Sequence, residues 1–131
     1  MSRLPTIEVD RDAAEPVYEQ IARQVRAQVA AGRLRPGAEL PSVRTLASDL
    51  GVNLNTVARA YRQLEEDGFL VIHERSGAVI AAPPADPDPT LAQRLRRELR
   101  LVLEHMRQAG FSPADLRRAT KREIDALDGR R

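Results

Sequence analysis

The sequence contains no cysteine among its 131 residues. Disulfide bonds, cysteine-ligated zinc and a cysteine nucleophile are therefore excluded. The two histidines, His73 and His105, lie in different segments, and neither has a second histidine or a nearby carboxylate at metal-ligand spacing. We therefore expect neither a metal site nor a bound cofactor.

Long hydrophobic runs are also absent. No apolar stretch approaches the roughly 20 residues of a membrane-spanning helix, and the N-terminus lacks the apolar core of a signal peptide. Lysine is almost absent, because Lys121 is the single example, which leaves no residue before it to form a Schiff base with pyridoxal phosphate. These absences favour a cytoplasmic protein that has no membrane contact and is not an enzyme.

The balance of charge says little about the partner. The formal net charge is +2, from 21 Lys and Arg against 19 Asp and Glu. A nucleic-acid-binding surface would therefore have to come from the local placement of basic side chains rather than from the charge of the whole chain.

Residues 41–77 carry the most informative pattern. The first part predicts a short helix, because apolar residues recur at i, i+3, i+4 and i+7 between an N-cap residue, Ser42, and a C-terminal glycine, Gly51. Asn53 is placed to cap a second helix that ends at Gly68. The apolar positions of the two helices are Val43, Leu46, Ala47 and Leu50, then Val57, Ala60, Tyr61 and Leu64. Two helices joined by a glycine-containing turn predict a helix-turn-helix, whose second helix can enter a major groove.

The flanking residues predict further elements of the same domain. Residues 4–9 form either a short strand or an arm, and a helix runs from Pro16 to Gly32. After the second motif helix, residues 69–73 and 78–82 are apolar and partly β-branched. They predict a β-hairpin with Gly77 at its tip.

The composition changes abruptly after residue 82. Four prolines fall in the segment 83–90, which predicts a stiff linker. Beyond it we expect a long helix capped by Thr90, and then a second helix that starts with a capping box at Ser112. The expected organisation is a winged helix-turn-helix domain in 1–82, a linker in 83–90 and a helical dimerisation region in 91–131. The fold class is mainly α with a small β-hairpin wing, followed by a two-helix appendage.

The run GRLRPGAELPSVRTLASDLGVNLNTVARAYRQLEEDGFLVIHERSG resembles the DNA-binding domain of the GntR family of bacterial transcriptional regulators. The resemblance covers about half of the chain, and the short appendage makes it most similar to the YtrA subfamily. It implies double-stranded operator DNA as a partner. We do not expect the larger effector or aminotransferase-like domains of other family members.

The resemblance also implies a set of DNA-contacting residues, some of which physical reasoning supports independently. Side chains at the start of the second motif helix lie beside free N–H groups, where a phosphate is favoured. Arg59 is opposite the apolar face of that helix and could donate to guanine or phosphate oxygens. The set is Arg44, Asn53, Asn55, Thr56, Arg59, Arg75 and Gly77.

Each of these residues has a structural alternative. Asn53 could serve only as an N-cap, and Gly77 is needed for the hairpin whatever the wing contacts. Arg44 and Arg59 could be solvated or paired with nearby acids. Tyr61 is expected in the core and His73 as an ordinary wing residue. Leu54 departs from the family pattern, in which Arg or Pro often lies between the two asparagines Asn53 and Asn55. The departure argues against a base-edge hydrogen bond at this position.

The long appended helix carries an apolar stripe that one weak neighbouring helix cannot cover. We therefore expect a two-fold homodimer, which would place two recognition helices roughly 34 Å apart, one DNA turn. The expected interface residues are Leu95, Leu99, Val102, Leu103 and Met106. The alternative is that the helices pack on the winged domain of their own chain.

The sequence thus predicts a sequence-specific transcriptional regulator, a repressor that binds a palindromic operator as a homodimer. The alternative function is a winged-helix protein-interaction module without specific DNA binding. The polar residues Asn55, Thr56 and Arg59 on the recognition face argue against that alternative. The sequence identifies no small-molecule effector, and whether one exists stays open.

Overall fold

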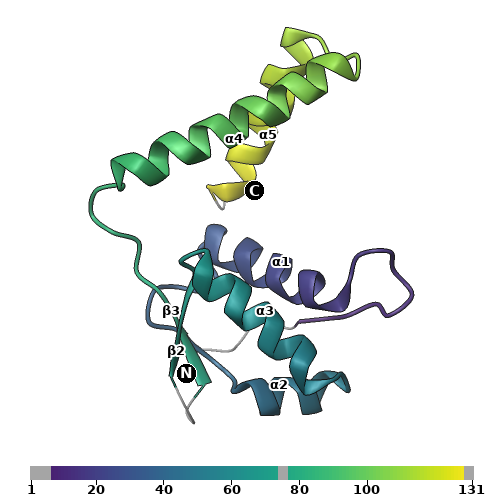
Figure 1. Cartoon of the computed structure of the whole chain (residues 1–131), viewed down its shortest axis with the longest axis vertical. Helices are drawn as coiled ribbons and strands as arrows, with labels where there is room; N and C mark the ends of the chain where they lie inside the picture. Colours follow the sequence, from purple (N-terminus) through teal and green to yellow (C-terminus); the bar gives the residue numbers. More distant parts are fainter. Residues whose placement is uncertain (1–6, 74–76, 129–131) are drawn as a thin grey trace. The chain divides into compact units, whose positions relative to one another are not determined.

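The computed structural model describes residues 7–73 and 77–128. The chain divides into two compact units, Met1–Pro83 and Pro84–Arg131. The first unit contains α1 (Val17–Ala30), β1 (Glu39–Leu40), α2 (Val43–Leu50), α3 (Leu54–Glu66), β2 (Leu70–His73) and β3 (Gly77–Ile80), and the second contains α4 (Pro89–Gln108) and α5 (Pro113–Leu127) (Figure 1). A mainly helical chain with a small antiparallel sheet confirms the predicted fold class. None of the described helices is long and apolar enough to cross a membrane.

The core of the first unit lies where α3 packs against both α1 and α2 (Figure 1). The buried face of α3 is the one predicted, with Val57, Ala60, Tyr61 and Leu64 all inaccessible to solvent. Burial of each large apolar side chain contributes about 1.5–3 kcal/mol, so this face holds the recognition helix firmly on its neighbours. The Tyr61 hydroxyl donates to the carbonyl oxygen of Pro41 at 2.6 Å, which satisfies its polar group inside the core.

Local capping sets the bounds of the two motif helices. The Ser42 Oγ accepts from the Thr45 backbone N–H at 3.1 Å and begins α2. Gly51 follows α2 with a φ of 67°, the left-handed conformation that glycine adopts without strain. The side chain of Asn53 accepts from the Asn55 backbone N–H at 2.7 Å and begins α3. All three predicted caps are confirmed.

The sheet differs from the predicted hairpin in two respects. It has three strands in the order β1-β3-β2, and the two-residue strand β1 was not predicted. Gly77 does not lie at the tip but is the first residue of β3, paired with His73 at the end of β2. The end of β1 approaches this residue closely and leaves no room for a side chain at position 77.

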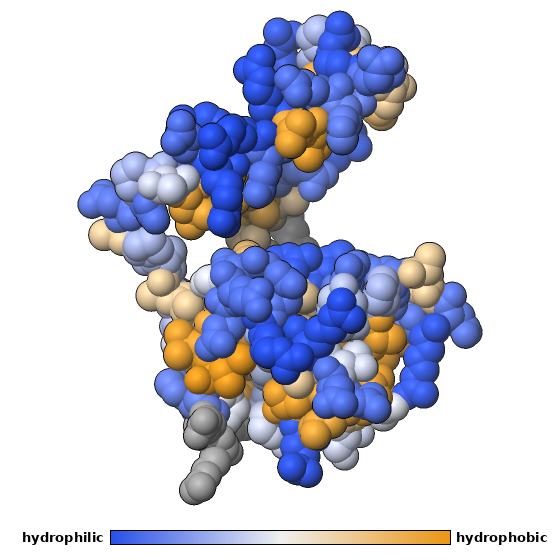
Figure 2. Space-filling model, viewed as in Figure 1, coloured by the Kyte–Doolittle hydropathy of each residue, from blue (hydrophilic) through white to orange (hydrophobic). Residues whose placement is uncertain are grey.

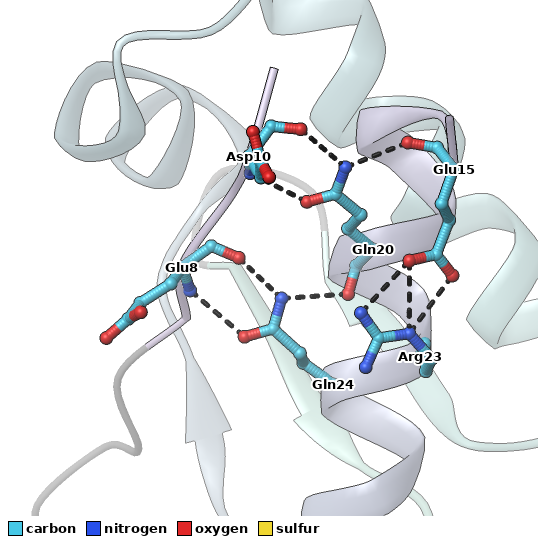
Figure 3. Close-up of polar contacts among 6 residues, drawn as sticks. All are labelled: Glu8, Asp10, Glu15, Gln20, Arg23 and Gln24. Atoms are coloured by element: carbon cyan, nitrogen blue, oxygen red, sulfur yellow. Dashed lines mark hydrogen bonds and ion pairs between the residues drawn. The ribbon is translucent and has the colours of Figure 1, made fainter. Parts of the chain in front are cut away.

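The N-terminal segment before α1 is held by two glutamine side chains (Figure 3). The Gln24 amide accepts from the Glu8 backbone N–H at 3.0 Å and donates to the Glu8 carbonyl oxygen at 2.6 Å. One turn earlier, Gln20 does the same with Asp10, at 2.8 Å in each direction, and also donates to the carbonyl oxygen of Glu15. Residues 7–10 are therefore an extended arm rather than a ladder strand, and the first six residues lie outside the described part of the chain.

The same segment reaches the helix-turn-helix. The guanidinium of Arg11 donates to the carbonyl oxygen of Gly51, at the turn between α2 and α3. At the other end of the segment, Arg23 on α1 makes a bidentate ion pair with Glu15, which lowers the pKa of that carboxyl group (Figure 3). The arm is thus fixed at both ends, on α1 and on the motif turn.

The second unit consists of two consecutive helices, α4 and α5, which contact each other. The cap of α4 differs from the prediction, because Asp88 rather than Thr90 begins the helix and accepts from the Thr90 backbone N–H at 3.0 Å. Proline is tolerated in the first turn of a helix, and Pro89 is already helical. The non-helical segment before α4 is therefore shorter than the predicted linker 83–90. The capping box of α5 between Ser112 and Asp115 is confirmed.

Candidate nucleic-acid interface

The outer face of α3 is polar and open to solvent. Asn55, Arg59 and Arg62 follow one another at i, i+4 and i+7, opposite the buried positions, and all three are exposed. Of these, Arg62 was not identified from the sequence. The signal that could have found it is the same helical spacing, counted from Asn55 instead of from the family motif.

The first turn of α3 offers donors to an anion. Free backbone N–H groups at a helix N-terminus attract negative charge. The Asn53 oxygen is engaged by the Asn55 N–H, so the capping role expected as an alternative is the one observed. Asn55 is exposed and Thr56 is half-buried beside it, which leaves Asn55 as the polar side chain most available at this end of the helix.

Arg44 lies in the first turn of α2 and is exposed. Neither Arg44 nor Arg62 takes part in an ion pair among the residues that the structure describes. An unpaired, hydrated guanidinium on the surface is free to bind a phosphate without first breaking an internal contact. The two residues therefore fit a phosphate-binding or base-reading role.

Arg59 has a neighbour that the sequence did not predict. Its guanidinium carbon lies 3.8 Å from the ring centroid of Tyr18 on α1, a cation–π contact. The helical spacing correctly placed Arg59 outside the core, but the contact directs its charged group toward α1. Any DNA contact by Arg59 would have to be made with the guanidinium in this position or at the cost of leaving the ring.

A hollow of about 420 Å³ lies between the start of α2, α3, the end of β2 and the first residue of β3. Its walls are mainly apolar, and Arg44 and His73 are among the residues that line it. The lining residues are Ser42, Val43, Arg44, Leu54, Tyr61, Ile72, His73 and Gly77. Leu54 and Arg44, from different helices, thus share one surface depression.

The wing residues divide into two cases. Arg75 lies outside the described residues, and its DNA contact stays a prediction. Gly77 is buried, and a Cβ added there would lie 2.7 Å from the carbonyl oxygen of Leu40. The structure therefore shows a steric need for glycine at position 77, and the DNA contact there stays a prediction.

Within residues 7–73 and 77–128, no group of three or more His, Asp or Glu side chains is arranged to hold a metal ion. The polar surface of α2 and α3 carries amides, hydroxyls and guanidinium groups. Such groups can form hydrogen bonds with anions and base edges.

Comparison with known proteins bears directly on this surface. The sequence model of the family described as "Bacterial regulatory proteins, gntR family" matches residues 17–80. The chain is 47% identical over 75 residues to the HTH-type transcriptional regulator Rv1152 of Mycobacterium tuberculosis, covering 57% of this chain and 62% of that protein. It is 39% identical over 75 residues to the HTH-type transcriptional repressor YtrA of Bacillus subtilis, covering 57% of this chain and 58% of that protein. The chain therefore spans less than two thirds of the length of these two relatives.

A solved structure extends the likeness beyond the motif. YtrA from Sulfolobus acidocaldarius, a GntR-family transcription factor, superposes with a TM-score of 0.63 at 37% identity, covering 76% of this chain and 95% of that chain. These relatives are transcriptional regulators, in agreement with the expectation that the chain is not an enzyme. The chain belongs to the GntR family and is similar to its YtrA-type regulators.

Proposed function

We propose that this chain binds double-stranded operator DNA and represses transcription. The observation that carries the proposal is the exposed polar face of α3, with Asn55 at its start and Arg62 two turns later, beside the unpaired Arg44 of α2. A helix of this polarity fits a major groove, where guanidinium and amide groups pair with base edges and phosphates. The similarity to a protein named as a transcriptional repressor supports the direction of regulation.

The proposed active form is a homodimer held by α4. Apolar residues recur at intervals of four, four, three and four positions along α4, which places them on one helical face, and Leu103 adjoins this face. The five in that series are Leu91, Leu95, Leu99, Val102 and Met106. Leu95, Leu99 and Val102 are exposed, and Leu103 and Met106 are half-buried. Figure 2 shows such apolar patches on the otherwise hydrophilic surface of the α4–α5 unit. A second copy supplies a matching apolar face, and two-fold symmetry then requires a palindromic operator.

The test begins with a selection of genomic DNA fragments by the purified protein, followed by titration of the selected duplex at several salt concentrations. Arg44→Ala should weaken binding to all sequences alike and reduce the salt slope by about 1, as expected for one lost phosphate contact. Arg62→Ala and Arg59→Ala are compared with it, and loss of a base contact should cost about 1–3 kcal/mol and relax specificity. Arg33→Ala, a charge-matched change in the exposed turn after α1, serves as the control.

Symmetry is tested on the operator itself. Inserting about five base pairs between the half-sites turns one of them to the opposite side of the duplex and should abolish cooperative binding. Indifference to the insertion would contradict the two-fold arrangement. Failure to select any fragment would favour the alternative, a winged-helix module that binds another protein.

A further inference from the structure

Leu54 is an exposed leucine at the first position of the recognition helix. Its side chain is 41% exposed, although the other large apolar side chains of α3 are in the core. It is not required for that core, because the buried face of α3 is complete without it. A large apolar group in this position is therefore unexplained by the folding of the domain.

The surroundings of Leu54 indicate what it could contact. It lines the hollow of about 420 Å³ together with Val43 and Ile72, and Arg44 lies at the same hollow. Tyr61 also lines this hollow, and its hydroxyl already donates its hydrogen to the Pro41 carbonyl oxygen. The hollow thus combines apolar walls with one guanidinium group.

Arg44 and Leu54 line the same hollow, so a DNA strand with a phosphate at Arg44 would have its base edges near the tip of α3. Of the groups exposed in the major groove, the C5-methyl of thymine is the apolar one, and apolar side chains recognise it by contact. The neighbouring Asn53 has its side-chain oxygen committed to the cap, whereas the exposed Leu54 and Asn55 side chains have no capping role.

We infer that Leu54 is a specificity-determining residue that contacts a thymine methyl group in each operator half-site. This inference rests on the proposed function. It assigns to the tip of the recognition helix a preference for thymine through apolar contact, in place of a hydrogen bond to a base edge. Asn55, the next residue, then supplies the polar contact beside it.

The experiment uses the selected operator, with each thymine replaced in turn by deoxyuridine, which removes the methyl group and changes nothing else in the pairing. The parent protein should lose affinity about fourfold per half-site at one symmetry-related position, the effect of one buried methyl group. In Leu54→Ala the ratio of affinities for thymine and deoxyuridine at that position should fall to about 1, and in Leu54→Met it should be retained.

Val71→Ala provides a matched control. Val71 is 44% exposed, but it lies on β2 and does not line the hollow, so this variant should keep the parent's preference for thymine. A parent protein indifferent to deoxyuridine at every position would overturn the assignment of Leu54 and leave DNA binding intact. So would a preference that persists in Leu54→Ala. Failure of the parent to select an operator would instead overturn the proposed function, and this inference with it.

Discussion

At the scale of single residues, position 77 shows how closely β1 and β3 approach. Gly77 has a φ of +101°, and an added Cβ would meet the Leu40 carbonyl oxygen at 2.7 Å. Gly68 after α3 has a similar φ of +84° but open space around it. A comparison of substitutions at these two glycines therefore separates the cost of backbone strain from the cost of steric collision.

We predict that Gly77→Ala destabilises the protein more than Gly68→Ala. Both substitutions should cost about 1–2 kcal/mol from the positive φ. The collision with β1 should add about 1–3 kcal/mol at position 77 alone. Urea denaturation of the two variants measures the difference, and equal losses would show that β1 moves aside without cost.

Arg59 shows why exposure alone does not define a contact. Its position on α3 was predicted correctly, but the 3.8 Å approach to the Tyr18 ring depends on how α1 lies against α3. Arg62, one turn further along, has no such neighbour among the described residues and is the freer of the two guanidinium groups.

At the scale of elements, the arm is attached both by the packing of Ile7 and Val9 against the core and by hydrogen bonds to α1. Gln20 is 4% exposed and its amide satisfies backbone groups of Asp10 and Glu15. Gln24 makes the corresponding pair of bonds with Glu8, at a more exposed position. The two side-chain amides thus pair with backbone N–H and C=O groups of the arm, as a neighbouring strand would do in a sheet.

We predict that Gln20→Ala destabilises the protein by about 1–3 kcal/mol, because it leaves partly buried backbone groups of Asp10 and Glu15 without partners. Hydrogen exchange of the Asp10 amide should become faster in this variant. Gln63→Ala is the control, since the Gln63 amide contacts only the exposed Asp67 side chain. Unchanged protection of the Asp10 amide would contradict the role of Gln20 in holding the arm.

The N-terminus of α5 should respond to acid. The Ser112 backbone N–H donates to the Asp115 carboxylate at 2.8 Å and, with Arg118 nearby, lowers the pKa of Asp115 below its usual value. A lowered folded-state pKa gives stability that is present above the unfolded pKa of about 3.9 and is lost as the pH falls through the folded value.

We therefore expect that, in the parent protein, the backbone amides in the first turn of α5 lose protection against hydrogen exchange when the pH is lowered below about 4. In Asp115→Asn this protection should be weaker at neutral pH and should vary less in that acid range. Asp125→Asn, which alters an exposed carboxylate paired with Lys121 later in α5, is the control. A parent-like acid response in Asp115→Asn would assign the effect to another group.

At the scale of the whole molecule, the proposed dimer depends on one face of α4. Leu99 lies in the middle of the apolar stripe and is 53% exposed, whereas Leu101 lies on the other side of the helix and is 55% exposed. The two leucines are matched in residue type, exposure and helix, and they differ in the face they occupy.

We predict that Leu99→Glu converts the dimer to a monomer, because a charge would be buried against the partner without a counter-charge. Leu101→Glu should remain a dimer. Sedimentation measures the mass, and operator affinity should fall in the monomer because one half-site supplies only part of the contacts. If Leu99→Glu stays dimeric, the stripe packs elsewhere and another surface holds the two copies.

The sequence by itself determined the helices of this protein and most of their ends, with the start of α4 as the exception. Ser42, Asn53 and Ser112 cap neighbouring backbone groups, and the apolar spacing of α3 selects its buried face, because both signals act within a few residues along the chain. The same local spacing sufficed to place Asn55 and Arg59 on the outer face of the recognition helix.

The tertiary structure alone decided which distant groups meet. The contact of Arg59 with Tyr18, the close approach of Gly77 to Leu40 and the bond from Arg11 to Gly51 each join segments far apart in the sequence. No local pattern encodes such pairs, because they follow from the packing of α1 and β1 on the motif. The hollow beside Leu54 arises in the same way, since its walls come from two helices and two strands that only folding brings together.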